Sequence, residues 1–294
     1  MVDVSPRAGA SIPGTFSGVV VDMAGTLLTS SGALSAKTLA AVRDLSNKGV
    51  LFAIATGRPV PSLQPHIDAI GLEVPCITFN GAAVCSLRPN APPHLIWQRP
   101  LGAAAVSSAI SATELLGLCL SYVMADCTVS RCHGHEQRRL LDKFEHLEGV
   151  KQRVVTSSAK LEGLPAPLKL VVLTRTPDAT AATLRAHLGS SAHVISAEMH
   201  AEILRPGVHK GNALSHLCKH CGAVPSEMVA FGDGMNDIEL LRTAGLGCAM
   251  LHARDEVRQA AEIVTDWNND DDGVVRQIEA MYSSGRIIAR CVAR

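Results

Sequence analysis

Short apolar runs alternate with helix-like segments in the first part of the chain. Residues Gly18–Asp22 form a continuous run rich in β-branched side chains, which is typical of a strand buried on both faces of a parallel sheet. Apolar side chains recur at helical spacing over Ser35–Lys48, with Ser35 as N-cap and Gly49 as C-cap. Strands that alternate with helices predict crossover units, and hence an α/β fold with a doubly wound parallel sheet. Two further buried strands are expected at Val50–Ala55 and Pro75–Phe79.

The middle of the chain has a different pattern, which begins near the proline-rich run Arg88–Pro93. Helices are expected at Gly102–Leu116 and Asp178–Leu188. We therefore expect residues 86–204 to form an inserted α+β domain. The strands expected within it are Leu118–Val123, Leu168–Thr174, His193–Ser196 and Ala201–Leu204.

The first pattern returns from Gly211 onward, where helices and buried strands again alternate. Residues 16–85 and 205–294 are therefore expected to form one core domain, preceded by a loose tail at residues 1–15. The elements expected after the insert are helices at Gly211–Cys221, Asp237–Ala244 and Asp255–Ala261, and strands at Met228–Phe231 and Gly247–Met250.

Composition disfavours several classes of function. The 294 residues are 47% hydrophobic and 18% charged, so the chain can bury a core. Its 27 basic and 27 acidic side chains give no net charge, whereas nucleic-acid binding needs a clustered basic surface. The most apolar stretch, Ala103–Ala125, contains too many polar residues to span a membrane. Nine cysteines, an odd number, and a tail without an apolar leader favour the reducing cytoplasm over a secreted disulfide framework.

Three of the expected strands end in polar residues and glycines. The carboxyl ends of parallel strands converge on one site, so Asp22, Asp233 and Asp237 are expected to lie close together. Adjacent carboxylates repel unless a cation neutralises them, and an all-oxygen ligand set favours Mg²⁺. Mg²⁺ favours a phosphate group as a further partner, for which Thr56 offers a hydroxyl and Lys210 a positive charge. One carboxylate could act as the nucleophile and form an aspartyl-phosphate.

These residues resemble the haloacid dehalogenase superfamily of Mg²⁺-dependent phosphohydrolases, and most closely its Cof-type sugar phosphatases. The resemblance covers Val19 to about Glu279, and Asn80–Ala82 agrees with it, as do Val264–Thr265 and Asp272–Val274. Any one motif is weak, but all occur in the order that the family requires. The four motifs that carry the resemblance are Asp22–Leu28, Thr56–Arg58, Lys210–Leu214 and Gly232–Asp237.

The resemblance implies a role for each of these residues. Asp22 is expected to attack phosphorus and to bind Mg²⁺. Asp233 is expected to be the second metal carboxylate, and Asp237 to hold the metal's shell directly or through water. Thr56 and Lys210 are expected to bind the phosphoryl oxygens. The other phosphate-binding groups that the resemblance implies belong to Gly25, Gly57, Arg58 and Asn236.

Ala24 departs from the family pattern, which has Asp at this position as general acid and base. The backbone carbonyl that the family donates to Mg²⁺ here is retained, but a proton transfer worth roughly 10²–10⁴-fold in rate is lost. The substitution is compatible with a laboratory change, with a natural pseudo-enzyme, or with chemistry that needs no acid, as in phosphonoacetaldehyde hydrolase. That enzyme inserts its cap between the first two motifs, and the short segment from Asp22 to Thr56 leaves no room for one.

Several residues also have plainer interpretations. Arg58 is expected either to contact the phosphate or to pair with a nearby carboxylate, and Glu202 and Arg205 could form only a surface pair. Two Cys/His groups, at residues 127–135 and 216–221, resemble zinc sites only in part, because neither has four ligands at a zinc-binding spacing. Residues 127–135 are better explained as a cap loop that contacts the leaving group.

The sequence therefore predicts a Mg²⁺-dependent phosphohydrolase of small phosphomonoesters, with turnover impaired by Ala24. Sugar phosphates, nucleotides and phosphorylated cofactors are the expected substrates, without a nucleic-acid or membrane partner. Two other functions stay open at this stage. One is a non-catalytic module that binds Mg²⁺ and a phosphorylated ligand, and the other is a phosphotransferase or mutase of the same fold.

Overall fold

The computed structural model describes residues 14–289, which fall into two compact units. The larger unit comprises the chain up to Gly57, Gln64–Trp97 and the chain from His209 onward. The smaller unit comprises Arg58–Leu63 and Gln98–Val208. The expected tail lies almost wholly outside the described residues, as does Cys291.

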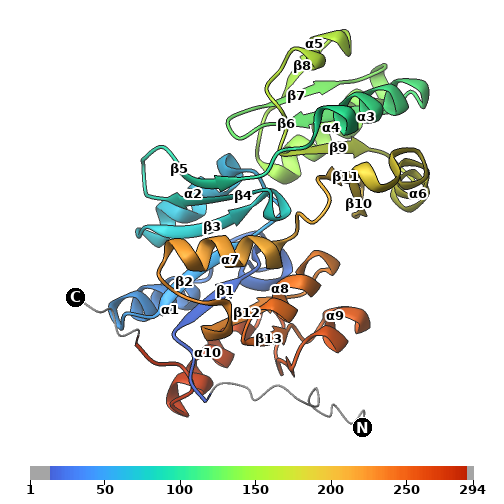
Figure 1. Ribbon diagram of the computed structural model, residues 1–294. Helices are drawn as coiled ribbons and strands as arrows, with labels where there is room; N and C mark the ends of the chain where they lie inside the picture. The colour runs from blue at the N-terminus through green and yellow to red at the C-terminus, as the bar shows by residue number, and fades with distance from the viewer. Residues whose placement is uncertain (1–13, 290–294) are drawn as a thin grey trace. The chain divides into compact units, whose positions relative to one another are not determined.

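The larger unit is built on an eight-stranded sheet with the order β14-β13-β12-β1-β2-β3-β4-β5 (Figure 1). The central strand β1 pairs in parallel with both β2 and β12, so the chain winds outward on both sides of it. This arrangement confirms the α/β, doubly wound fold class, although β4 runs antiparallel to β3. The strands are β1 (Gly18–Val21), β2 (Leu51–Ala55), β3 (Val74–Thr78), β4 (Ala83–Leu87), β5 (His94–Gln98), β12 (Met228–Gly232), β13 (Leu246–Ala249) and β14 (Ile263–Val264).

Six helices pack on this sheet within the described residues, and four of them, α1, α7, α8 and α9, lie where the sequence predicts helices, whereas α2 and α10 were not predicted. Ser35 caps α1 by accepting a hydrogen bond from the Thr38 N–H (2.9 Å), and Gly49 follows the helix with φ 72°. Side chains of α7, α8 and α9 share one buried cluster with Val20, Ala230 and other strand residues. The helices of this unit are α1 (Ala36–Asn47), α2 (Val60–Ile70), which begins in the smaller unit, α7 (Lys210–His220), α8 (Ile238–Thr243), α9 (Asp255–Ala260) and α10 (Gly273–Ser283).

The smaller unit contains a six-stranded sheet with the order β10-β11-β9-β6-β7-β8. All neighbouring strands in it are antiparallel except β7 and β8. Helices α3 and α6 bury their apolar residues in one cluster with alternate residues of β6, β9 and β11. The elements are β6 (Cys119–Val123), β7 (Thr128–Arg131), β8 (Arg153–Val155), β9 (Lys169–Leu173), β10 (His193–Ser196), β11 (His200–Leu204), α3 (Ala103–Leu115), α4 (His135–Glu148), α5 (Ala159–Glu162) and α6 (Pro177–Leu188).

The boundary between the two units lies later in the sequence than the proline-rich run suggests. The insert was expected from residue 86, but β4 and β5 extend the large sheet, so the larger unit continues to Trp97. Strand pairing decides this boundary, and pairing cannot be read from local composition. Within residues 14–289, no helix has the length and apolar character needed to cross a membrane.

Candidate active site

Three carboxylates gather at the carboxyl ends of two neighbouring strands. Asp22 directly follows β1, and Asp233 and Asp237 follow β12, its parallel neighbour. One carboxylate oxygen from each residue lies within 4.8 Å of the other two. Asp22 and Asp237 are buried and Asp233 is partly exposed, so the cluster has one side open within this unit.

Lys210, the first residue of α7, places its ammonium between two of these acids. Its Nζ lies 2.5 Å from Asp22 Oδ1 and 2.6 Å from Asp237 Oδ1. Burial disfavours the charged ammonium, but both carboxylates outweigh this effect and raise the pKa of Lys210 above its ordinary value. The side chain is fully buried, so Lys210 is a fixed cation of the site and not a solvated surface lysine.

The site nevertheless carries more negative than positive charge. Burial, together with the charge of Asp237, raises the pKa of Asp22 to about 8 even though Lys210 acts in the opposite direction. Burial also raises the pKa of Asp233. A divalent cation would favour the charged forms of these groups and reverse both shifts. The all-oxygen donor set and the surplus negative charge therefore fit a hard cation such as Mg²⁺.

Backbone and hydroxyl donors hold the carboxylates in place. The Thr26 hydroxyl donates to Asp233 Oδ1 (2.6 Å), and the N–H groups of Asp233 (3.2 Å) and Gly234 (2.9 Å) donate to Asp237 Oδ2. Gly25 has φ 77°, and a Cβ at this position would lie 2.4 Å from Asp233 Oδ2. A glycine is therefore required in the turn Met23–Leu27 for both its conformation and its contact.

The amides of Asn80 and Asn236 link two further segments at this end of the sheet. Asn236 Nδ2 donates to Asn80 Oδ1 at 2.8 Å, and the Asn80 N–H donates to the Thr56 carbonyl at 3.1 Å. Thr56 is buried, and a Cβ on Gly57 would lie 2.9 Å from Asn80 Oδ1. Asn80 thus links residues of two of the four motifs, Thr56–Arg58 and Gly232–Asp237.

Sequence reasoning assigned no role to three residues that support this site. Each of them contacts a predicted site residue or its neighbour. The Thr26 hydroxyl donates a hydrogen bond to Asp233, and Asn80 accepts one from Asn236. Gly81 packs against the backbone of His209 and Lys210. A Cβ on Gly81 would lie 2.4 Å from the His209 carbonyl oxygen. The Asn-Gly pair that ends the third strand was the available signal for two of them.

Two further predicted site residues lie in the turn after Asp22 and in the segment after β2. Ala24 is exposed within the turn that follows Asp22, so its methyl group occupies a solvent-accessible position. Arg58 begins the segment that belongs to the smaller unit, and its predicted contact with phosphate stays a prediction.

The interpretation of Glu202 and Arg205 as a surface pair is wrong. Glu202 is buried and bonds Lys169, whereas Arg205 donates to the Pro100 carbonyl (3.3 Å).

The Cys/His groups do not bring three potential metal ligands together in the part of the chain that the structure describes. The three aspartates are the one group of three potential metal ligands found among residues 14–289. His216 stacks on Trp97 with ring centroids 4.0 Å apart, and Cys218 is buried in the core of the larger unit. These contacts account for residues 216–221 as packing residues.

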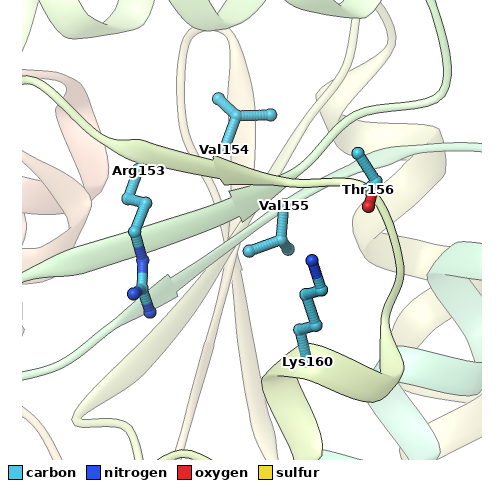
Figure 2. Close-up of a pocket in the computed structure, with 5 residues that line it drawn as sticks. All are labelled: Arg153, Val154, Val155, Thr156 and Lys160. Carbon is cyan, nitrogen blue, oxygen red and sulfur yellow. The ribbon is translucent and has the colours of Figure 1, made fainter.

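Two cavities of the smaller unit are lined by described residues, and the carboxylate cluster is in the lining of neither. The first, of about 440 Å³, is lined by β8 and the start of α5; Figure 2 shows Arg153 and Lys160 at its two sides. The second, of about 190 Å³, includes Asp126, Cys127 and Lys151 in its wall. The prediction that residues 127–135 contact a leaving group is not tested by either cavity.

Comparison with known proteins places the chain among phosphate-processing enzymes. Residues 19–278 match the haloacid dehalogenase-like hydrolase family. A Bacillus subtilis relative, 5-amino-6-(5-phospho-D-ribitylamino)uracil phosphatase YitU, is 29% identical, with 90% of this chain and 97% of the relative covered. The HMP-PP phosphatase of Escherichia fergusonii is 30% identical over 81% of this chain and 85% of its own. A solved Thermotoga maritima structure has a TM-score of 0.77 at 25% identity, covering 90% of this chain and 97% of its own.

Proposed function

The chain belongs to the haloacid dehalogenase-like hydrolases, in their Cof-type branch, and is a phosphatase by that kinship; we propose that it hydrolyses small phosphomonoesters with Mg²⁺ and through an aspartyl-phosphate. The observation that carries the proposal is the group of Asp22, Asp233 and Asp237 around Lys210. Kinship alone supports the reaction class, and this group supports the cofactor and the nucleophile.

Asp22 is the proposed nucleophile. Its carboxylate oxygen forms a bond to phosphorus while the bond from phosphorus to the leaving oxygen breaks, and water later cleaves the acyl-phosphate to regenerate the carboxylate. Asp22, Asp233 and Asp237 would hold Mg²⁺, whose charge offsets that of the phosphoryl group when it is bound. Lys210 favours the charged form of Asp22 and orients its carboxylate through their 2.5 Å contact.

The remaining predicted residues would position the phosphoryl group. Thr56 follows β2, the parallel neighbour of β1, and we propose that it donates its hydroxyl to a phosphoryl oxygen, aided by the N–H groups of Gly25 and Gly57. Asn236 is held by Asn80 and would orient the phosphate or Lys210. Fixed donors at the ends of β-strands suit a reaction that depends chiefly on positioning and charge.

Ala24 removes the side chain that would protonate the leaving oxygen. The site thus retains its nucleophile and charge compensation but lacks an acid at this turn. A general acid and base is typically worth roughly 10²–10⁴-fold, so turnover of esters with poor leaving groups should be low. Ala24 is exposed, so an aspartate at this position has room to adopt a rotamer without displacing the core.

The experiment that tests this function is phosphate release from 4-nitrophenyl phosphate and from a panel of sugar phosphates and nucleotides, with Mg²⁺. The panel includes 5-amino-6-(5-phospho-D-ribitylamino)uracil because a relative is named for it. We expect Ala24→Asp to raise the rate roughly 10²–10⁴-fold, more for alkyl phosphates than for the aryl ester. Ala24→Asn is the matched control, since it has the same shape but no titratable proton. Equal gains in both variants, or activity that persists in EDTA, would contradict the proposal.

Ala24 also favours a second candidate, a non-catalytic module that binds Mg²⁺ and a phosphorylated ligand. Such a module would retain the ligand without releasing phosphate, and Ala24→Asp would not restore turnover. Equilibrium binding of a phosphorylated ligand beside the phosphate-release assay separates the two candidates.

A further inference from the structure

Two cysteines of the smaller unit face each other across neighbouring strands. In the antiparallel pair β6–β7, Leu120 lies opposite Arg131, which places Cys119 opposite Cys132 one step further along. Their sulfur atoms lie 2.8 Å apart, closer than two sulfurs that merely touch. None of the four family motifs includes either residue, and neither is among the residues proposed to bind Mg²⁺ or the phosphoryl group.

Cys119 and Cys132 lie at a position of the hairpin where the two strands are especially close. Met124 N–H donates to the Cys127 carbonyl (2.9 Å), which marks residues 124 and 127 as a hydrogen-bonded pair. Bonded and non-bonded pairs alternate along antiparallel strands, so Cys119 and Cys132 occupy a non-bonded pair, where Cα atoms lie about 4.5 Å apart. That separation is within the range that a disulfide spans. The side chains of Ser121 and Ser130, on the same face, also meet, with their hydroxyls 2.9 Å apart.

The two sulfurs differ in exposure and in charge. Cys119 is buried, whereas Cys132 is partly exposed at the corner before α4. The Cys119 thiol bonds Cys132 and lowers the pKa of that thiol, with Arg138 and Arg131 acting in the same direction, while the pKa of Cys119 is raised. Cys132 is thus the thiol with more thiolate and easier access, and Cys119 is the shielded thiol behind it.

We propose that Cys119 and Cys132 form a reversible disulfide, in which Cys132 reacts first with a hydroperoxide and Cys119 resolves the product. The Cys132 thiolate attacks the peroxide oxygen, the O–O bond breaks, and a sulfenic acid forms with release of water or an alcohol. Cys119 sulfur then attacks the Cys132 sulfur, the S–O bond breaks, and water leaves with the proton of Cys119. Two thiols are oxidised by two electrons, and the hydroperoxide is reduced. A dithiol reverses the step by thiol–disulfide exchange.

Another cysteine pair provides an internal contrast. Cys76 and Cys85 also lie directly opposite each other, on the antiparallel strands β3 and β4 of the larger unit. Both are buried, and burial raises the pKa of each thiol. An oxidant in solution has access to neither, so this pair should stay reduced in the folded protein under conditions that oxidise Cys119 and Cys132.

The bond would fix the end of the hairpin where the chain turns into α4. At this corner the Cys132 carbonyl accepts a hydrogen bond from Arg131, and the His133 N–H donates to Gln137 Oε1 (2.8 Å). A cross-link here holds the first turn of α4 to the start of β6. Oxidation should therefore raise the resistance of this unit to proteolysis at the corner.

The test uses the reduced full-length chain, treated with hydrogen peroxide, alkylated with iodoacetamide, digested without reductant and analysed by mass spectrometry. We expect one cross-linked peptide that joins Cys119 to Cys132, loss of two hydrogens in the intact mass, and full reversal by dithiothreitol. Cys76 and Cys85 should be recovered alkylated after unfolding. Both Cys119 and Cys132 recovered alkylated, or Cys132 joined to Cys127 instead, would overturn the proposal.

Serine variants test the order of the two steps. In Cys119→Ser, the sulfenic acid should persist on Cys132 and be trapped by dimedone, whereas Cys132→Ser should yield no dimedone adduct on Cys119. Cys127→Ser, at an exposed cysteine of the same hairpin, is the matched control and should oxidise as the wild type does. A dimedone adduct on Cys119 in the Cys132→Ser variant would overturn the assigned order. The wild-type cross-link needs no variant, so the proposal is testable even if a serine variant folds poorly.

Discussion

Two buried lysines, one in each unit, lie in opposite electrostatic environments. Lys210 of the larger unit contacts two carboxylates, those of Asp22 and Asp237, and a third acid lies beside them. Lys169 of the smaller unit forms a salt bridge with Glu202 on the adjacent strand β11. Both lysines and their partners are almost completely shielded from solvent, so burial alone does not distinguish the two sites.

The two sites shift the pKa values of their acids in opposite directions. Burial and Asp237 raise the pKa of Asp22 to about 8. Burial acts in the same direction on Glu202, but Lys169 and His200 outweigh it and hold the pKa of that carboxyl far below its usual range. A carboxylate matched by cations is a structural pair, whereas carboxylates in excess mark a place where a cation from solution belongs. Comparing charge balance thus separates a binding site from a core contact.

The largest expected effect is on catalysis at the unbalanced site. In the Ala24→Asp background, Asp22→Asn should lower phosphate release by roughly 10³-fold or more, because it removes the proposed nucleophile. The stability of the metal-free protein should not fall, because the substitution relieves repulsion and leaves Lys210 paired with Asp237. Phosphate-release kinetics and urea unfolding measure the two effects. Asp44→Asn, at an exposed acid of α1, is the control; activity in Asp22→Asn equal to that of this control would rule out the nucleophile assignment.

Substitution at the Lys169–Glu202 pair should change the free energy of unfolding of the protein. Glu202→Gln leaves the buried Lys169 without its carboxylate, and breaking a buried pair in this way costs about 3–5 kcal/mol. The double variant Glu202→Gln/Lys169→Met should recover most of that loss, because both charges are then gone. Urea unfolding of the full chain measures both changes. A loss below about 1 kcal/mol would mean that solvent reaches the pair and that the contrast with Lys210 is overstated.

Mg²⁺ should stabilise the protein through the carboxylate cluster alone. At a concentration about 100 times its Kd, a cation that binds only the folded state adds about 2.7 kcal/mol to the free energy of unfolding. Asp233→Asn should remove this increment, whereas Glu202→Gln should keep it, although its baseline stability is lower. Thermal unfolding with Mg²⁺ or EDTA gives the comparison. An unchanged increment in Asp233→Asn would place the cation elsewhere.

The smallest effect is a pH dependence that belongs to Glu202. Its pKa is lowered on folding, so its contribution to stability is present above its ordinary pKa of 4.5 and is lost as the pH falls below that value. The stability difference between wild type and Glu202→Gln should therefore be constant at neutral pH and shrink in acid, by at most about 1.4 kcal/mol per pH unit. Urea unfolding at a series of acidic pH values tests this. A difference that grows in acid would reverse the assigned direction.

Local patterns in the sequence account for most of the larger unit. Buried strands such as β1 and β2 are continuous apolar runs, and α1 has a serine N-cap and a glycine after its end, so periodicity and caps predict them. Helix α4 was not predicted, because its charged residues outnumber the few that it buries, Leu141 and Phe144 among them. Strand β7 is four residues long with the polar residues Thr128 and Ser130 at buried positions, and β8 is three residues long and mostly exposed. Neither has an apolar run, so their existence depends on pairing with other strands.

The sequence predicts the acidic residues of the site but not the residues that hold them by hydrogen bonds. Asp22, Asp233 and Asp237 stand at strand ends, and the convergence of such ends follows from parallel topology. The bonds from Thr26 to Asp233 and from Asn236 to Asn80 depend on side-chain directions across the sheet, which spacing does not encode. The same holds for Glu202, whose partner Lys169 lies 33 residues earlier in the chain.

The central position of β1 has a consequence for synthesis of the chain on the ribosome. Its partner β12 and the contact from Lys210 to Asp22, 188 residues apart, become available only after most of the polypeptide has been made. Until then one edge of β1 is an unpaired, fully apolar strand, which is a hazard for aggregation. All six strands of the smaller sheet lie within residues 119–204 and can pair earlier. A nascent chain can thus carry a paired smaller sheet while its acidic cluster is still incomplete.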